Sequence, residues 1–225
     1  MVFAVLVVVL LGLMYLPSFW VRHVLKKHSA PRDDFPGNGA DMAHHLINLM
    51  ALGDVKVEIT EHGDHYDPSD KAVRLTEDKY KTPSLTGVVV AAHEVGHAIQ
   101  DHQKESLFQW RSAMAWIAML VNKLAPVLLL AAPALAIWNP AFSRWSLVAA
   151  IASVLVGVLL NLITLPVEWD ASFGKALPML EAGQYLNEQD MRAARQILLA
   201  AALTYVAASL ASLLNLGTLL RVLRR

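Results

Sequence analysis

The sequence predicts a mainly α-helical, multi-span membrane protein with about four transmembrane helices and a small α+β subdomain. Hydrophobic residues make up 56% of the 225 residues and charged residues only 17%, and the mean hydropathy is positive. This composition is apolar for a soluble protein. The apolar residues are also clustered in four long runs, with two polar blocks between them. A short histidine and glutamate motif in the first polar block is the third informative feature.

Each of the four apolar runs is long enough to cross a hydrocarbon core of ~30 Å. Residues 1–20 carry no charge. They lack the basic start and small-residue cleavage site of a signal peptide, so an uncleaved anchor is the favoured interpretation over a cleaved signal. Residues 114–138, 145–165 and 196–220 form the other three predicted spans. Tryptophans near the span ends suit a membrane interface: Trp110, Trp116, Trp138 and Trp145.

The first polar block, residues 21–111, is expected to fold into the α+β subdomain. The predicted elements before its final helix are a linker at 26–39, a helix at 40–52, strands at 55–59 and 72–75, and a turn at 64–70. Prolines and glycines indicate the linker, helical spacing of apolar residues the helix, and alternation the strands. We interpret the two strands as a small hairpin, whose exposed edge could hold an extended peptide.

The final helix of this block, predicted at residues 84–103, carries the motif HEVGH at residues 93–97. Thr82 or Ser84 can cap its start. The motif fits the pattern H-E-x-x-H. Its histidines lie about 40° apart around a helix, so both imidazoles can reach one metal ion. Three ionisable side chains would be costly to bury unpaired in an apolar helix, which favours a zinc site over two packing histidines.

A catalytic zinc site needs a third protein ligand and one open position. The chain has no cysteine, so zinc must take nitrogen or oxygen ligands. His102 does not match the third histidine of metzincins, which would stand at residue 103, and it lies about 140° around the helix from His97. A carboxylate is therefore the natural candidate. Glu168 and Asp170 both stand at the end of the third span, in the second polar block at residues 166–195.

Three sequence blocks, VAAHEVGHAIQ at residues 90–100, HYDP at 65–68 followed by VRL at 73–75, and LPVEWDAS at 165–172, resemble the membrane-embedded neutral zinc metallopeptidases of the YugP type. The resemblance extends from about residue 40 to the C-terminus. It implies a zincin-like catalytic subdomain and a gluzincin site.

In gluzincins a glutamate on a second helix completes the site, so the resemblance implies Glu168 as the third ligand. In the related heat-shock and prenyl-processing membrane peptidases an aspartate follows that glutamate by four residues. Ser172 occupies this position here, which makes Asp170 the candidate for the orienting role.

The predicted spans agree with a metal shared by residues of the two polar blocks. Two spans separate His93 from Glu168, so both residues return to the same side of the membrane. The resulting organisation is an N-terminal transmembrane anchor at 1–20, a catalytic subdomain with the zinc helix at 21–111, two transmembrane helices at 112–165, the second half of the zinc site at 166–195, and a last transmembrane helix at 196–220.

The predicted function is that of a membrane-bound zinc metalloendopeptidase. We expect one Zn²⁺ per chain, held by His93, His97 and Glu168, with Glu94 as general base for a zinc-bound water. Candidates for the donor to the developing oxyanion are His102, Tyr185 and Arg74. The alternative is a non-catalytic membrane protein with a structural or sensory zinc site. Such a site would close the fourth position with a protein ligand, and no fourth ligand is evident.

The expected partners are the lipid bilayer and a protein or peptide substrate that is itself membrane-associated. A formal net charge of zero and the lack of a long basic run argue against nucleic acid. Basic residues after the first span, in the segment 22–32, favour a cytoplasmic active site in a bacterial cell membrane. The basic residues at 221–225 favour the opposite orientation, because four spans would place them outside the cell.

Overall fold

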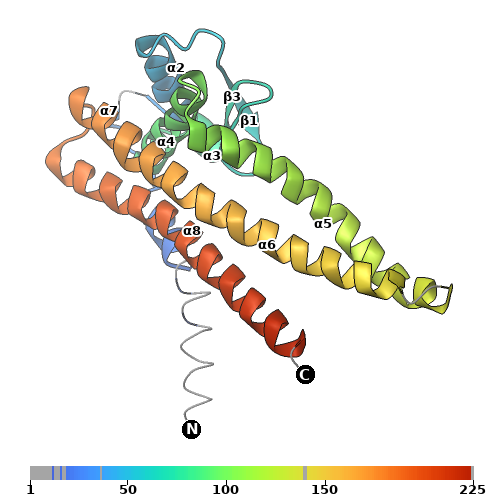
Figure 1. The fold of residues 1–225 in the computed structure, drawn as a ribbon. Helices are drawn as coiled ribbons and strands as arrows, with labels where there is room; N and C mark the ends of the chain where they lie inside the picture. The colour runs from blue at the N-terminus through green and yellow to red at the C-terminus, as the bar shows by residue number, and fades with distance from the viewer. Residues whose placement is uncertain (1–11, 13–15, 17–18, 36, 139–140, 224–225) are drawn as a thin grey trace.

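Helices dominate the part of the chain that the computed structural model describes, which comprises residues 12, 16, 19–35, 37–138 and 141–223. A helical segment at 19–27 leads into a subdomain that contains α2, α3, α4 and a three-stranded sheet. Three long helices, α5, α6 and α8, extend from the subdomain in one direction (Figure 1). The predicted mainly helical fold with a small sheet is therefore confirmed.

The elements have the following bounds: α2 Gly39–Leu49, β1 Lys56–Thr60, β2 His65–Asp67, β3 Ala72–Thr76, α3 Glu77–Lys81, α4 Leu85–His102, α5 Ser106–Trp138, α6 Ala141–Trp169, η1 Asp170–Ala176, α7 Leu177–Ala182 and α8 Glu188–Leu223. The element η1 is a π-helix that continues directly from α6.

The two helices predicted in the first polar block form, and side-chain caps define where they begin. Asn38 and Asp41 make a reciprocal capping box at the start of α2, with both hydrogen bonds at 3.0 Å. At the start of α4, the Ser84 hydroxyl accepts a hydrogen bond from the Gly87 N–H at 3.1 Å. Ser84, rather than Thr82, is the N-cap at which the zinc-motif helix begins.

The sheet differs from the predicted hairpin. Its order is β1-β3-β2, with β1 parallel and β2 antiparallel to β3. The hairpin between the first and last strands is therefore wrong, because the segment predicted as a turn contains β2, which pairs with β3 on its other side. Arg74 on the central strand forms ion pairs with Glu58 on β1 and Asp67 on β2. One guanidinium thus links all three strands.

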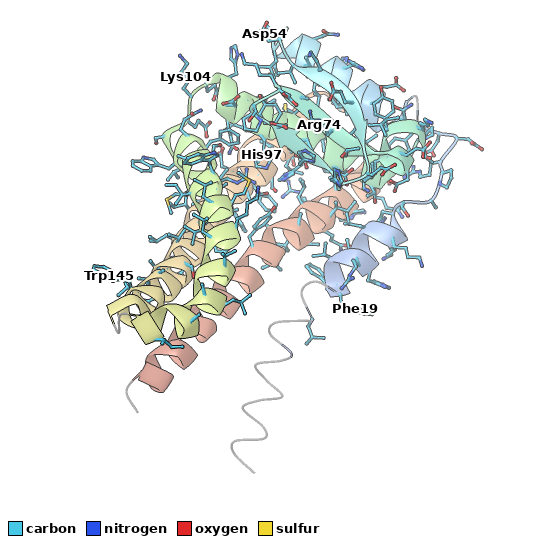
Figure 2. The ribbon with its side chains drawn as sticks, turned by 90° about the vertical axis from the view of Figure 1, so that its right-hand side faces the viewer. Phe19, Asp54, Arg74, His97, Lys104 and Trp145 are labelled. Atoms are coloured by element: carbon cyan, nitrogen blue, oxygen red, sulfur yellow. The ribbon has the colours of Figure 1, made fainter. Side chains whose placement is uncertain are left out.

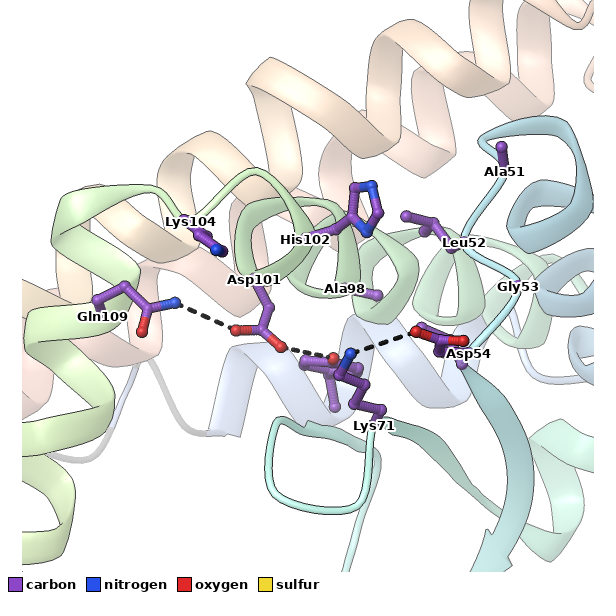
Figure 3. Close-up of a pocket in the computed structure, with 12 residues that line it drawn as sticks. Ala51, Leu52, Gly53, Asp54, Lys71, Ala98, Asp101, His102, Lys104 and Gln109 are labelled. Atoms are coloured by element: carbon purple, nitrogen blue, oxygen red, sulfur yellow. Dashed lines mark hydrogen bonds and ion pairs between the residues drawn. The ribbon is translucent and has the colours of Figure 1, made fainter.

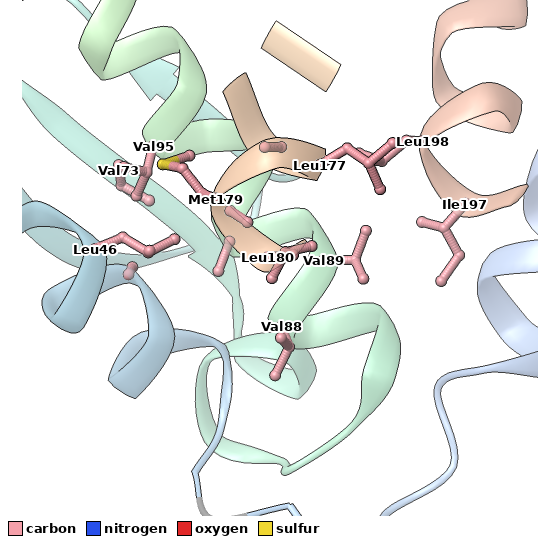
Figure 4. Packing of buried hydrophobic residues seen from close by; sticks show 14 of the residues in the cluster. Leu46, Val73, Val88, Val89, Val95, Leu177, Met179, Leu180, Ile197 and Leu198 are labelled. Atoms are coloured by element: carbon pink, nitrogen blue, oxygen red, sulfur yellow. The ribbon is translucent and has the colours of Figure 1, made fainter. Parts of the chain in front are cut away.

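Helix α4 lies at the centre of the fold, with 15 of its 18 residues buried. Its apolar residues pack against side chains from the sheet and from helices on both sides (Figure 4). The cluster includes Leu46 of α2, Val73 of β3, Leu180 of α7 and Ile197 of α8. Because side chains of α2, β3, α7 and α8 all pack around α4, the position of the zinc motif depends on the whole core.

The predicted membrane spans lie on long helices. Residues 114–138 lie within α5, 145–165 within α6 and 196–220 within α8. Among the described residues, one helical stretch, Ile151–Ala182, is long and apolar enough to cross a membrane. The predicted span 1–20 falls mostly outside the described residues. The count of four spans therefore stays a prediction.

A glycine lets α4 approach η1 closely. A Cβ built on Gly96 would lie 2.8 Å from the carbonyl oxygen of Ala171, which is closer than real side chains approach. The neighbour is backbone, so it cannot move aside by changing a rotamer. Gly96 inside the HEVGH motif thus allows the backbone contact between the two halves of the chain.

We expect Gly96→Ala to destabilise the protein by about 1–3 kcal/mol, because the added methyl group forces α4 and η1 apart. Thermal unfolding of the purified protein measures the effect. Gly157→Ala is the matched control, since a Cβ at Gly157 of α6 meets nothing within 4 Å. This control should be neutral, or more stable by up to about 1 kcal/mol. Equal melting temperatures for both variants would contradict the close-packing argument.

Candidate metal centre

Three buried side chains from distant parts of the sequence converge in one place. His93 and His97 extend from α4, and Glu168 comes from the end of α6. Glu168 Oε2 lies 3.2 Å from His93 Nε2 and 3.4 Å from His97 Nε2. His97 lies where the sheet-bearing subdomain meets the long helices (Figure 2). The three side chains that the sequence singled out as metal ligands are therefore neighbours in the fold.

Two of the three separations between these atoms fit a tetrahedral zinc ion. Ligand atoms about 2.1 Å from a tetrahedral ion stand roughly 3.4 Å from one another. Each of the three side chains offers one nitrogen or oxygen atom, and these atoms all lie within 4.8 Å of one another. The two separations to the carboxylate agree with the tetrahedral value within a few tenths of an ångström. The donor set, two imidazoles and a carboxylate, is one that zinc accepts.

The second nitrogen of each imidazole has its own partner. His93 Nδ1 lies 3.2 Å from the Ser172 hydroxyl, and His97 Nδ1 lies 2.9 Å from Gln100 Oε1. A neutral imidazole that presents Nε2 as a ligand carries its proton on Nδ1 and donates it there. Such contacts fix the tautomer and the ring orientation of a metal-binding histidine. Both rings are therefore held with Nε2 towards Glu168.

Asp170 is connected to the metal centre through Gln100, which contacts His97. Its carboxylate accepts a hydrogen bond from Gln100 Nε2 at 2.8 Å, and Gln100 also donates to the Val167 carbonyl at 2.9 Å. Lys175 forms ion pairs with Asp170 and, at 2.6 Å, with Glu105. Ser172, which stands where related peptidases have an aspartate, instead contacts a histidine directly. Ser172 therefore orients His93, and the Gln100–Asp170 pair orients His97.

The electrostatic surroundings favour a negative charge on Glu168. Arg111 Nη2 lies 3.0 Å from Glu168 Oε1, an ion pair without hydrogen-bond geometry. One carboxylate oxygen therefore faces the imidazoles and the other faces the guanidinium. Burial opposes the charged form of His93, but the hydrogen bond to Glu168 and the nearby carboxylates outweigh this effect and raise the pKa of the imidazole. The carboxylate therefore attracts positive charge, whether a proton or a metal ion, to this position.

Glu94 is buried beside the metal centre and opens onto a cavity of about 190 Å³. His93 and Glu168 line the same cavity. Most of its other lining residues come from the helical segment 19–27 and from α8, and Asp64 and Val90 complete the lining: Val21, Leu25, Asp64, Val90, Ile197, Leu198, Ala201 and Tyr205. Burial raises the pKa of the Glu94 carboxyl, because the charged form is desolvated. Glu94 thus adjoins the ligands without being one of the three converging groups.

The three candidates for the oxyanion donor lie elsewhere. His102 lines a separate cavity of about 610 Å³ together with Asp101 (Figure 3). The Tyr185 hydroxyl lies 2.6 Å from His45 Nε2, and Arg74 is held by carboxylates of the sheet. None of the three lines the cavity that Glu94 and His93 share.

Sequence reasoning missed three side chains around the centre. Gln100 could have been found, because residues three apart on a helix are neighbours and Gln100 follows His97 by three. Arg111 and Tyr205 stand on other helices, and no local pattern marks them. They become visible only when α5 and α8 are placed beside Glu168.

Comparison with known proteins agrees with this geometry. The chain belongs to the family described as "Putative neutral zinc metallopeptidase", whose family model matches residues 3–224. It is similar to the "Putative membrane protease YugP" of Bacillus subtilis (strain 168), with 33% identity over 218 residues, which cover 96% of this chain and 94% of the relative. The search of solved structures finds no match. The predicted family and the predicted zinc cofactor are confirmed.

We expect Glu168→Gln to weaken zinc binding by more than roughly 100-fold, since even residues that only support a ligand contribute about 10–100-fold. Metal analysis after dialysis against a weak chelator measures this loss. Glu181→Gln is the control, because Glu181 is a half-exposed carboxylate paired with Arg195 and is not in the cluster. Full zinc retention in Glu168→Gln would exclude Glu168 as a ligand.

Proposed function

We propose that this protein is a membrane-bound zinc metalloendopeptidase in which Glu94 is the general base. The observation that carries the proposal is that a carboxylate outside the ligand cluster lines the same cavity as two of the three ligand side chains. A structural zinc site needs no such group. A hydrolytic site does, because the attacking water must lose a proton.

In the proposed reaction His93, His97 and Glu168 hold the metal. Bound zinc would polarise the scissile carbonyl and activate a water molecule. Glu94 accepts the proton that the water loses as its oxygen bonds to the carbonyl carbon. Glu94 then delivers this proton to the leaving amine nitrogen as the peptide C–N bond breaks.

The exposed surface of the long helices supports a membrane location. Leu130 and Ile137 on α5 are 84% and 83% exposed, and Trp145 on α6 is 69% exposed. Apolar side chains exposed along such lengths require a covering partner. A lipid bilayer suits them, since Lys123 is the one charged residue of the predicted span 114–138. We propose that α5, α6, α8 and residues 1–20 provide four spans of a bacterial cell membrane.

The cavity walls suggest a substrate class. The helical segment 19–27, which overlaps the end of the predicted span 1–20, lines the cavity beside Glu94. The α8 residues that line it belong to the first part of the predicted span 196–220. A polypeptide that reaches the site must therefore come close to the bilayer surface. We propose protein substrates that are membrane-associated, cleaved at or near the membrane surface. Basic residues in the segment 22–32 support a cytoplasmic location of this site.

A structural or sensory zinc site is the competing function. It would require a fourth protein ligand to close the coordination sphere. Among the described residues, the ligand cluster contains three members. The site thus keeps a position that a water molecule can take, which favours hydrolysis.

We expect Glu94→Gln to retain zinc and to lose about 10²–10⁴-fold in peptidase activity, because the amide cannot accept the proton. Degradation of a fluorescently labelled unfolded protein by the purified full chain measures the rate, and metal analysis measures zinc. Glu188→Gln, a change at a carboxylate with 95% side-chain exposure, is the control and should retain full activity. If Glu94→Gln were as active as the wild type, the proposed mechanism would be wrong.

We expect a cysteine introduced at Asp54 to be labelled by a membrane-impermeant thiol reagent only after cells are permeabilised. Asp54 has a side chain that is 86% exposed, and the chain has no cysteine of its own. A cysteine at Ser143, at the far end of the α5–α6 pair, should label on intact cells. Reversed labelling of the two sites would place the zinc site outside the cell.

A further inference from the structure

Hydrolysis by the proposed mechanism needs a hydrogen-bond donor for the carbonyl oxygen, which becomes negatively charged when water adds. The polar residues that line the cavity beside Glu94 are Asp64, His93, Glu94, Glu168 and Tyr205. Three of these carry carboxylates, which repel a developing anion, and His93 belongs to the ligand cluster. Tyr205 is the one residue in this lining with a hydroxyl group.

Tyr205 lies on the face of α8 that lines the cavity beside the metal centre. Ile197, Ala201 and Tyr205 follow one another at intervals of four, so they share a helix face, and all three line the cavity. The Tyr205 side chain also interacts with the Glu168 carboxylate. The phenol therefore stands beside a proposed metal ligand and lines the cavity that Glu94 adjoins.

Arg111 also carries donors near the centre, but it is placed differently. Its guanidinium is engaged by Glu168 Oε1 at 3.0 Å, and it does not line the cavity. Arg111 therefore stabilises the negative charge of Glu168 from outside the cavity. Tyr205, in contrast, lines the cavity that Glu94 adjoins.

We infer that Tyr205 is a catalytic residue, whose hydroxyl donates a hydrogen bond to the carbonyl oxygen of the scissile peptide as negative charge develops on it. The inference rests on the proposed peptidase function. A tyrosine hydroxyl, with an ordinary pKa of about 10, keeps its proton at neutral pH and remains a donor throughout the reaction. Donors placed at a developing oxyanion contribute about 10²–10³-fold to the rate, because they stabilise the transition state more than the bound substrate.

Tyr205→Phe tests this role, because it removes the hydroxyl and leaves the ring that packs in the cavity. We expect kcat to fall by about 10²–10³-fold, with KM and zinc content unchanged. Affinity for a phosphinic peptide, which mimics the tetrahedral state, should fall by a similar factor, whereas affinity for the cleaved product should not. Tyr185→Phe is the matched control, because Tyr185 pairs with His45 outside this cavity, and its activity should match that of the wild type.

Two results would overturn the inference. An unchanged kcat in Tyr205→Phe would show that the hydroxyl is not used. A loss of zinc that accounts for the loss of activity would make Tyr205 a positioning residue for Glu168. Failure of the proposed function looks different, since the wild type would then cleave nothing or Glu94→Gln would be fully active. If Glu94→Gln is inactive and Tyr205→Phe is not, the peptidase assignment stands and the tyrosine assignment fails.

Discussion

The close approach of α4 to η1 is the constraint on which the metal centre depends. Gly96 brings the two backbones together at Ala171, a contact that any side chain at this position would prevent. This approach places a carboxylate of one helix 3.2–3.4 Å from two imidazoles of another, close to the spacing that tetrahedral zinc requires. The apolar core around α4 holds this distance, because the zinc helix is buried along nearly its whole length.

Charged groups buried this deeply need partners, and the partners also orient the site. Ser172 and Gln100 hold the two imidazoles, and Asp170 holds Gln100 in turn. Arg111 balances Glu168 from the side away from the histidines. Each group that lowers the cost of burial therefore also limits the directions in which a ligand atom can point. The chain belongs to a zinc metallopeptidase family, so this network surrounds the residues that could hold its zinc ion.

The long helices that carry the exposed apolar surface also contribute residues to the metal centre and to the cavity beside it. The cavity beside Glu94 is walled by α8 and by the segment 19–27, so the same helices that would enter a bilayer also shape the space next to the metal centre. The name of the YugP relative describes a membrane protease. Under the proposed function, this shared wall restricts substrates to polypeptides that lie close to the membrane.

The sequence by itself determined what depends on local backbone geometry. Helical periodicity located α2 and placed His93 and His97 on one face with Glu94 beside them. A predicted cap marked the start of α4, and alternation indicated strands. Spacing alone left Glu168 and Asp170 both open as the third ligand, and the resemblance implied Glu168. Only the tertiary structure decided the parallel pairing of β1 with β3, the π-helical η1, and the presence of Arg111 and Tyr205 at the centre. These features depend on packing between segments far apart in the chain, whereas the HEVGH spacing is set within a single turn of helix.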